Sequence, residues 1–265
     1  MSLELILLLM ALGGFVGVMA GLLGIGGGLI VVPALTIILP WSGISAELTM
    51  LMALGTSLAT IILTSGSSAF NHLRLGNVDL YVVKWLIPGV IIGGFIGTYV
   101  ADWVPTHYLP RIFGFIVLGL ALQMLISARS KRVRAMPSPL NTSLSGTVIG
   151  IISSLAGIGG GSLTVPFLSR YGVEMRKAVG SSSVCGCMIA IAGMLGFMFH
   201  GHGVEGLPKY SLGYIYLPAL FAIAFTSVLT TRIGARLATK LPTASLKKIF
   251  ALFLLFIAAS MLISS

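Results

Sequence analysis

Long apolar stretches separated by short polar connections fill almost the whole chain. Most of them have the roughly 17 to 25 residues that a helix needs to cross a hydrocarbon core of about 30 Å. Charged residues make up only 8% of the chain, against about a quarter in a soluble domain. The pattern therefore predicts an all-α membrane protein. Its ten hydrophobic segments cover residues 5–23, 28–39, 48–69, 81–101, 109–127, 143–157, 161–169, 179–199, 213–231 and 249–264.

The second half of the sequence repeats glycine positions of the first half with the same spacing. In each half, two glycines one turn apart precede the pentapeptide GIGGG, and a proline follows it five residues later. The matching sets are Gly13, Gly17, residues 24–28 and Pro33 in the first half, and Gly146, Gly150, residues 157–161 and Pro166 in the second.

This duplication divides the chain into two membrane repeats. We expect a first repeat at residues 1–128, a basic cytoplasmic linker at 129–141 and a second repeat at 142–265. Each repeat holds five segments, and an odd number makes the second repeat start from the opposite side of the membrane. The repeats are therefore expected to be inverted, an arrangement that keeps a transporter's substrate near the middle of the bilayer.

The positive charges predict how the chain is oriented in the membrane. Of the 16 Lys and Arg residues, 14 lie in alternate connections, and only Arg111 and Lys209 lie in the others. The positive-inside rule puts the 14 in the cytoplasm and both termini outside the plasma membrane. The net charge of +10 is then a topology signal with anionic lipid headgroups as its partners, and no nucleic acid is expected.

Each GIGGG pentapeptide interrupts an apolar segment. Unpaired backbone groups are tolerated at membrane depth only when they are buried in protein or face water. A chain without Cβ atoms lets a ligand approach the backbone, and the helix that restarts after the break offers free N–H groups to an anion. We therefore predict one small-anion site at the two breaks, formed by Gly24, Gly26, Gly27, Gly28, Gly157, Gly159, Gly160, Gly161 and Ser162.

The prolines after the breaks are expected to support them. Pro33 and Pro166 deprive the carbonyls of Leu29 and Ser162 of their helical partners. Two alternatives stay open: the short segments after the breaks either span the membrane or form re-entrant helix pairs, and the glycines either bind a ligand or only allow close packing. For the glycines spaced one turn apart we predict a role in close helix packing; these are Gly13, Gly17, Gly21, Gly89, Gly93 and Gly97.

Hydroxyl groups recur after each break, and a few charges flank the membrane segments. Thr56 and Ser57 match Ser181 and Ser182, and such neutral donors suit an oxyanion, so we assign all four to substrate binding. Arg74 is assigned to the same site, as a positive charge at the cytoplasmic mouth. Ionisable groups near the membrane are candidates for proton coupling, here His72, Asp79 and His200. Cys185 and Cys187 cannot build a metal site, so no metal and no cofactor are expected.

These features together resemble the TauE/SafE family of sulfite and organosulfonate exporters. The resemblance rests on the paired glycine motifs, on the hydroxyl element after each, and on the stretch R-x-G-x-V-D at residues 74–79. It implies a plasma-membrane secondary transporter that exports small sulfur-containing anions, such as sulfite or sulfoacetate, with proton coupling, and it leaves a homodimer open. Alternating access between the two halves, with the anion held at the glycine breaks, is the expected mechanism.

Two other function classes stay open at this point. An anion channel would use the same breaks. An intramembrane serine hydrolase would pair Ser162 with His200 or His202, but the first half carries Leu29 where the serine would be. We therefore expect a transporter and not an enzyme.

Overall fold

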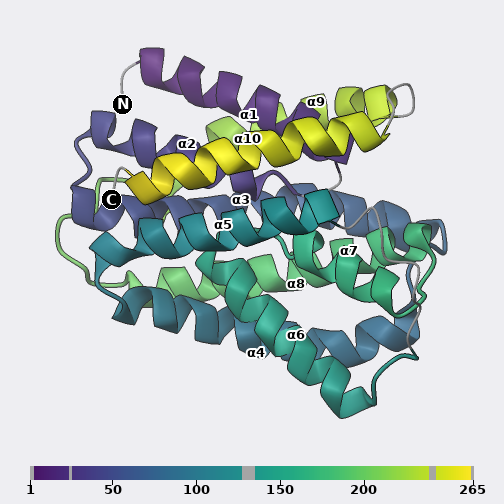
Figure 1. The fold of residues 1–265 in the computed structure, drawn as a ribbon. Coiled ribbons are helices and arrows are strands. Elements are labelled where there is room, and N and C mark those ends of the chain that lie inside the picture. The colour runs from purple at the N-terminus through teal and green to yellow at the C-terminus, as the bar shows by residue number, and fades with distance from the viewer. Residues whose placement is uncertain (1–2, 24–25, 127–134, 239–242, 264–265) are drawn as a thin grey trace.

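The computed structural model describes residues 3–23, 26–126, 135–238 and 243–263. Gly24 and residues 129–134 of the predicted linker lie outside the described residues. The helices, shown in Figure 1, are α1 (Leu3–Leu23), α2 (Gly28–Ile38), α3 (Ala46–Arg74), α4 (Leu80–Trp103), α5 (Leu109–Ile126), α6 (Pro139–Leu155), α7 (Gly161–Arg170), α8 (Met175–His200), α9 (Leu217–Ala238) and α10 (Thr243–Ile263). Two 3-10 turns and one hairpin complete the described elements: η1 (Leu39–Ser42), η2 (Thr106–Tyr108), β1 (Ser211–Leu212) and β2 (Ile215–Tyr216).

The all-α membrane class is confirmed. Six helices of the described chain, α1, α3, α4, α5, α8 and α9, are long and apolar enough to cross a membrane. Large apolar side chains such as Phe15, Phe95, Phe221 and Phe256 are exposed on the outer helices, as expected for faces in contact with lipid. The start of α1 and the end of α10 lie at the same end of the bundle (Figure 1).

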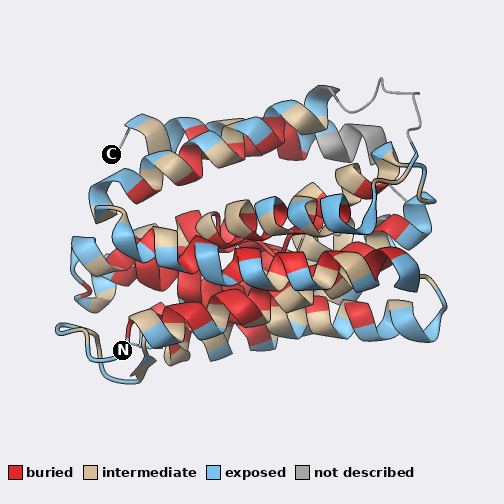
Figure 2. Cartoon of the chain, turned by 90° about the horizontal axis from the view of Figure 1, so that it is seen from below, coloured by how far each residue is buried: buried red, intermediate tan, exposed pale blue. Residues whose placement is uncertain are grey.

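Helices α3 and α8 form the centre of the molecule. They are the most buried of the long helices and pack against each other. Figure 2 shows the buried residues concentrated in the middle of the bundle, with exposed residues on the outer faces. Leu58 of α3 and Phe197 of α8 are completely buried there.

Glycines bring the outer helices into close contact with each other. Helix α1 packs on α9 and α4 packs on α6. A Cβ atom added at these positions would overlap backbone atoms of the neighbouring helix, so the predicted packing role is confirmed for Gly13, Gly17, Gly89, Gly93 and Gly97. Gly21 borders a cavity instead.

Both predicted helix breaks are present. Helix α2 begins after Gly27 (φ 74°) and α7 begins after Gly160 (φ 67°), and both glycines have the left-handed conformation that favours this residue. With 11 and 10 residues, α2 and α7 are roughly 16 and 15 Å long, and neither alone crosses a hydrocarbon core of about 30 Å. Their lengths favour the re-entrant alternative.

A hairpin replaces the predicted start of the ninth segment. We expected an apolar helix from residue 213, but β1 and β2 pair in antiparallel register and α9 begins only at Leu217. Gly213 (φ 58°) provides the turn. The Tyr214 N–H donates to the Phe197 carbonyl (3.2 Å), and the Tyr216 N–H donates to Thr56 Oγ1 (3.0 Å), so the hairpin is fixed to α8 and α3.

Candidate anion site at the helix breaks

A cavity of about 460 Å³ lies beside both helix breaks. The breaks contribute Gly26, Gly159 and Gly161 to its lining. Helices α3 and α8 contribute mainly hydroxyl and amide side chains, and α1 and α9 contribute mainly small or apolar ones. The remaining lining residues are Ala20, Gly21, Thr64, Ser65, Ser67, Ser68, Asn71, His72, Leu75, Val179, Ser182, Ser183, Val228, Thr231 and Arg232.

Ser65 is a polar side chain that meets both breaks. Its Oγ lies 3.6 Å from the position that a Cβ would occupy on Gly26, and 3.3 Å from that position on Gly159. The residue is 8% exposed, and within the described residues its hydroxyl forms no hydrogen bond. A hydroxyl with this position is a donor ready for a ligand held between the two breaks.

Further polar groups extend from Ser65 along α3 and α8. The Ser68 and Ser183 hydroxyls are hydrogen-bonded to each other (3.0 Å) and join the two helices at the cavity wall. The Ser182 hydroxyl donates to the Val179 carbonyl (2.8 Å). His72 lines the cavity, and its Nδ1 is buried with no hydrogen-bond partner in the part of the chain that the structure describes.

Gly28 of the first break packs against Gly157 of the second. A Cβ on Gly28 would overlap the Gly157 carbonyl oxygen, so only glycine lets the start of α2 approach the second break this closely. The Ser57 hydroxyl donates to that same carbonyl over 2.8 Å. The breaks are therefore in contact on the side away from the cavity, and three of the predicted residues, Gly28, Ser57 and Gly157, form that contact.

Thr56 and Ser181 have corresponding backbone contacts. Thr56 accepts the Tyr216 N–H just before α9, and Ser181 accepts the Asp79 N–H (2.9 Å) just before α4. Both residues are fully buried, and neither lines the cavity. The repeated hydroxyls thus anchor two connections, one to α9 and one to α4.

The predicted charged residues are dispersed. The guanidinium carbon of Arg74 lies 4.1 Å from the centroid of the Phe70 ring, and Arg74 does not line the cavity. Asp79 is the N-cap of α4 and accepts the Val82 N–H (3.2 Å). His200 lies roughly 30 Å along α8 from the cavity-lining Val179, as the rise of 1.5 Å per residue requires.

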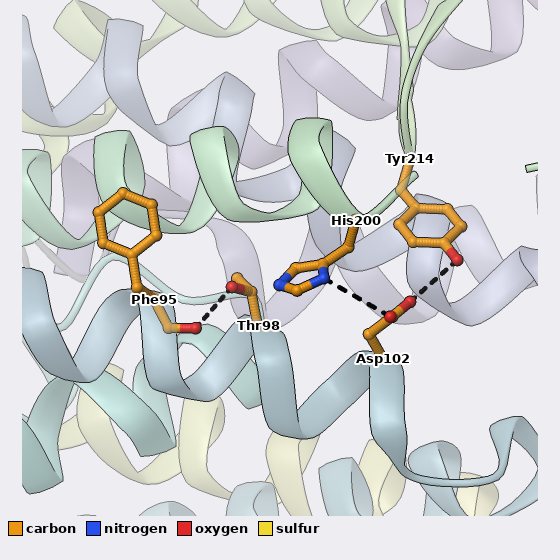
Figure 3. Close-up of polar contacts among 5 residues, drawn as sticks. All are labelled: Phe95, Thr98, Asp102, His200 and Tyr214. Atoms are coloured by element: carbon orange, nitrogen blue, oxygen red, sulfur yellow. Dashed lines mark hydrogen bonds and ion pairs between the residues drawn. The ribbon is translucent and has the colours of Figure 1, made fainter. Parts of the chain in front are cut away.

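His200 belongs to a separate polar cluster at the end of the bundle that holds the hairpin. Its Nδ1 lies 3.6 Å from Asp102 Oδ2, and the Tyr214 hydroxyl donates to Asp102 Oδ1 (3.0 Å), as Figure 3 shows. Burial raises the pKa of Tyr214 to about 12, and the hydrogen bond and negative charge of Asp102 act in the same direction. Tyr214 therefore remains a hydrogen-bond donor throughout the physiological pH range.

Ser162 and the two prolines do not line the cavity. Ser162 Oγ is buried and has no hydrogen-bond partner among the described residues, so no serine–histidine dyad is formed there. Pro33 and Pro166 lie inside α2 and α7, each after the first turn. Cys185 and Cys187 are free thiols.

Ser65, Asn71 and Arg232 are among the cavity residues that the sequence did not single out. Ser65 was one hydroxyl in a row of several on α3, and Arg232 was counted only among the cytoplasmic charges. Asn71 precedes His72 by one residue and drew no attention by itself. A helical projection of α3 finds Ser65, Ser68 and His72 on one face, since they are three and four residues apart.

Known proteins resemble this chain over nearly its whole length. The family model described as "Sulfite exporter TauE/SafE" matches residues 9–261. A probable membrane transporter protein of Haemophilus influenzae is 42% identical over 97% of both chains. A probable membrane transporter protein of Methanocaldococcus jannaschii is 28% identical over 88% of this chain and 86% of its own length. The probable membrane transporter protein YunE of Bacillus subtilis is 24% identical over 96% of each chain. No solved structure matches the chain significantly.

The protein is a multi-pass membrane protein with two broken helices beside a polar cavity. The chain belongs to the TauE/SafE family, which confirms the resemblance found in the sequence. The relatives carry the names of transporters and not of enzymes.

Proposed function

We propose that the protein is a secondary transporter that exports small sulfur-containing anions, such as sulfite, sulfoacetate or a related organosulfonate, across the plasma membrane. The observation that carries the proposal is the cavity beside both breaks, which presents Ser65 to Gly26 and Gly159. Its lining combines neutral hydroxyl and amide donors with one arginine, a set suited to an oxyanion. The family description as sulfite exporters supports the sulfur chemistry.

The backbone N–H groups of the restarting helices support the same proposal. The first N–H groups of a helix have no partner within it. In α2 the first N–H group that forms a helical hydrogen bond is that of Ile30, which donates to the Gly27 carbonyl. In α7 it is that of Leu163, which donates to the Gly160 carbonyl. The N–H groups before them, at Gly28 and Gly161 among others, carry the positive end of the helix dipole toward the breaks.

An inverted relation between the halves would allow this site to face each side of the membrane in turn. The helix pairs α1–α9 and α4–α6 support it, since each joins the first helix of one half to the fourth of the other. Two hydrogen bonds support it as well. Thr56 of the first half accepts the Tyr216 N–H of the second half, and Ser181 of the second half accepts the Asp79 N–H of the first. We infer that residues 1–128 and 142–265 are the two inverted repeats.

The two halves use the equivalent residues Ser57 and Ser182 differently, as a transporter open to one side requires. The Ser57 hydroxyl donates to the Gly157 carbonyl and does not line the cavity, whereas its counterpart Ser182 lines the cavity and donates to the Val179 carbonyl of its own helix. The charge pattern assigns the end of the bundle with Arg232 to the cytoplasm. In the proposed mechanism this structure represents an inward-facing state, with the Ser57–Gly157 contact and the hairpin as the closure on the outer side.

A site that is closed on one side is the arrangement expected of a carrier, whereas an open channel offers a continuous path. Counterflow in proteoliposomes tests the difference. Vesicles with purified protein, preloaded with unlabelled sulfite, should accumulate labelled sulfite faster than vesicles loaded with chloride, and the rate should saturate. A rate that rises linearly with concentration and does not depend on the internal anion would contradict a carrier. Protein-free vesicles set the background.

A further inference from the structure

Arg232 is a fixed positive charge at the cavity, and no carboxylate neutralises it within the described residues. It lies on α9 next to Thr231 and one turn after Val228, and all three residues line the cavity. The contact of His200 Nδ1 with Asp102 Oδ2 lies at the other end of the bundle. Arg232 is exposed and borders the cavity, so its charge is accessible to an anion that enters from the cytoplasmic side.

The remaining lining groups bring no permanent charge to the site. Among the described residues no Asp or Glu lines the cavity. Ser65, Ser68 and Asn71 are neutral donors, and His72 has a buried Nδ1 without a hydrogen-bond partner in the described chain. The cavity thus offers one full positive charge, that of Arg232.

We propose that Arg232 determines the charge of the transported anion, and that the cavity selects anions with a single negative charge, such as hydrogensulfite, over dianions such as sulfoacetate. This inference rests on the proposed function of anion transport. The guanidinium presents parallel N–H groups that match two oxygens of one oxyanion, and its charge balances one negative charge. A second negative charge would have to leave water without a partner, which is unfavourable inside a protein.

The position of Arg232 distinguishes this role from a topological one. A charge that only fixes the orientation of α9 would act equally well as Lys, and it would not need to border the site. Arg176 is the matched comparison, because it is an exposed arginine on the same predicted side, in the first turn of α8, and does not line the cavity.

Isothermal titration of the purified full-length protein with methanesulfonate and with sulfate, at constant ionic strength, tests the inference. Both are tetrahedral sulfur oxyanions, and they differ in charge. The wild type should bind methanesulfonate more tightly than sulfate. Arg232→Gln should weaken methanesulfonate binding about 10- to 100-fold, the range for a hydrogen bond to a charged group. Arg232→Lys should retain part of the affinity, and Arg176→Gln should bind like the wild type.

Unchanged methanesulfonate affinity in Arg232→Gln, or a wild type that prefers sulfate, would overturn the inference. Sulfite counterflow by the wild type, measured in parallel, separates this failure from that of the proposed function. If counterflow is present and Arg232→Gln binds normally, only the role of Arg232 is wrong. If the wild type neither moves sulfite nor binds methanesulfonate, the proposed function fails and the inference fails with it. Size-exclusion chromatography of each variant confirms that it is folded.

Discussion

The Ser57 hydroxyl donates a hydrogen bond of 2.8 Å to the main-chain carbonyl of Gly157, 100 residues further along the chain. This contact joins the first half of the protein to the helix break of the second. Ser182 corresponds to Ser57 in the sequence repeat, yet its hydroxyl bonds within α8 and faces the cavity. The two halves therefore use equivalent residues differently, and that difference has testable consequences.

Ser57→Ala should favour opening on the side that the contact closes. A buried hydrogen bond of this kind contributes about 1 kcal/mol, which corresponds to a roughly fivefold shift between two conformations. Solvent accessibility of a cysteine that replaces Met52, a completely buried residue of α3 five positions before Ser57, reports the opening. We expect faster labelling by a membrane-impermeant thiol reagent in Ser57→Ala than in the Ser57 background, with Cys185 and Cys187 replaced by alanine in both. Equal labelling rates would contradict a closing role for Ser57.

Ser65→Ala should weaken anion binding with little effect on stability. The hydroxyl faces both breaks and makes no hydrogen bond within the described residues, so its removal leaves no internal partner unpaired. We expect about tenfold weaker sulfite affinity, the lower end of the range for a hydrogen bond to a charged group. The measurement is the concentration that half-saturates counterflow. Ser145→Ala removes an exposed hydroxyl that bonds to the Asn141 carbonyl and should change nothing. The site would have to be relocated if Ser65→Ala transported with normal affinity.

Gly28→Ala should disrupt the contact between the two breaks. The added Cβ would overlap the Gly157 carbonyl and come 2.8 Å from the Ile61 side chain, and overpacking of this kind costs about 1 to 3 kcal/mol. Gly119→Ala is the matched control, since a Cβ there meets no atom within 4 Å. Thermal unfolding should show Gly28→Ala less stable than the wild type and Gly119→Ala equal to it or more stable. Two variants of equal stability would mean that the breaks do not touch.

Tyr214→Phe should change the alkaline stability profile. The folded pKa of about 12 lies above the ordinary value of 10.0, so the protonated hydroxyl stabilises the fold below pH 10, and this contribution is lost as the pH rises toward 12. Thermal stability of the wild type should fall across that window more steeply than that of Tyr214→Phe. Tyr81→Phe alters an exposed tyrosine and serves as the control. Parallel profiles for wild type and Tyr214→Phe would contradict the role of this hydroxyl.

Arg74→Gln should lower the apparent affinity for anions only slightly from the cytoplasmic side. Its guanidinium lies over Phe70 and outside the cavity lining, so it acts on an approaching anion through solvent. We expect an effect of about twofold at low salt that disappears at high salt, where charges are screened beyond a few ångström. A loss as large as that of Arg232→Gln, independent of salt, would place Arg74 in the binding site itself.

The helix breaks could be predicted from the sequence because their cause is local. Gly27 and Gly160 adopt the left-handed conformation that a clustered glycine motif makes accessible, and the apolar context restricts such a break to a protected site. The packing role of glycines such as Gly13 and Gly93 could also be predicted, because they are spaced one helical turn from the next glycine.

The composition of the cavity could not be predicted in the same way. Which face of α3 meets the breaks depends on how α3 and α8 pack, so Ser65 could not be separated from its neighbours by its residue type. The repetition of hydroxyl residues in both halves did not reveal their role either. Thr56 and Ser181 both anchor the backbone, and a repeated pair of ligand contacts would look the same in the sequence. The hairpin before α9 was missed because its apolar residues read as the start of a helix.

The central claim is that a small anion is held beside both helix breaks, and a high-resolution density map of the protein with bound sulfite tests it most directly. The account predicts density for one sulfite that touches Gly26, Gly159 and the Ser65 hydroxyl, with α2 and α7 starting beside it. Sulfite bound elsewhere with this cavity empty, or two pentapeptides that continue α1 into α2 and α6 into α7 as unbroken helices, would contradict it.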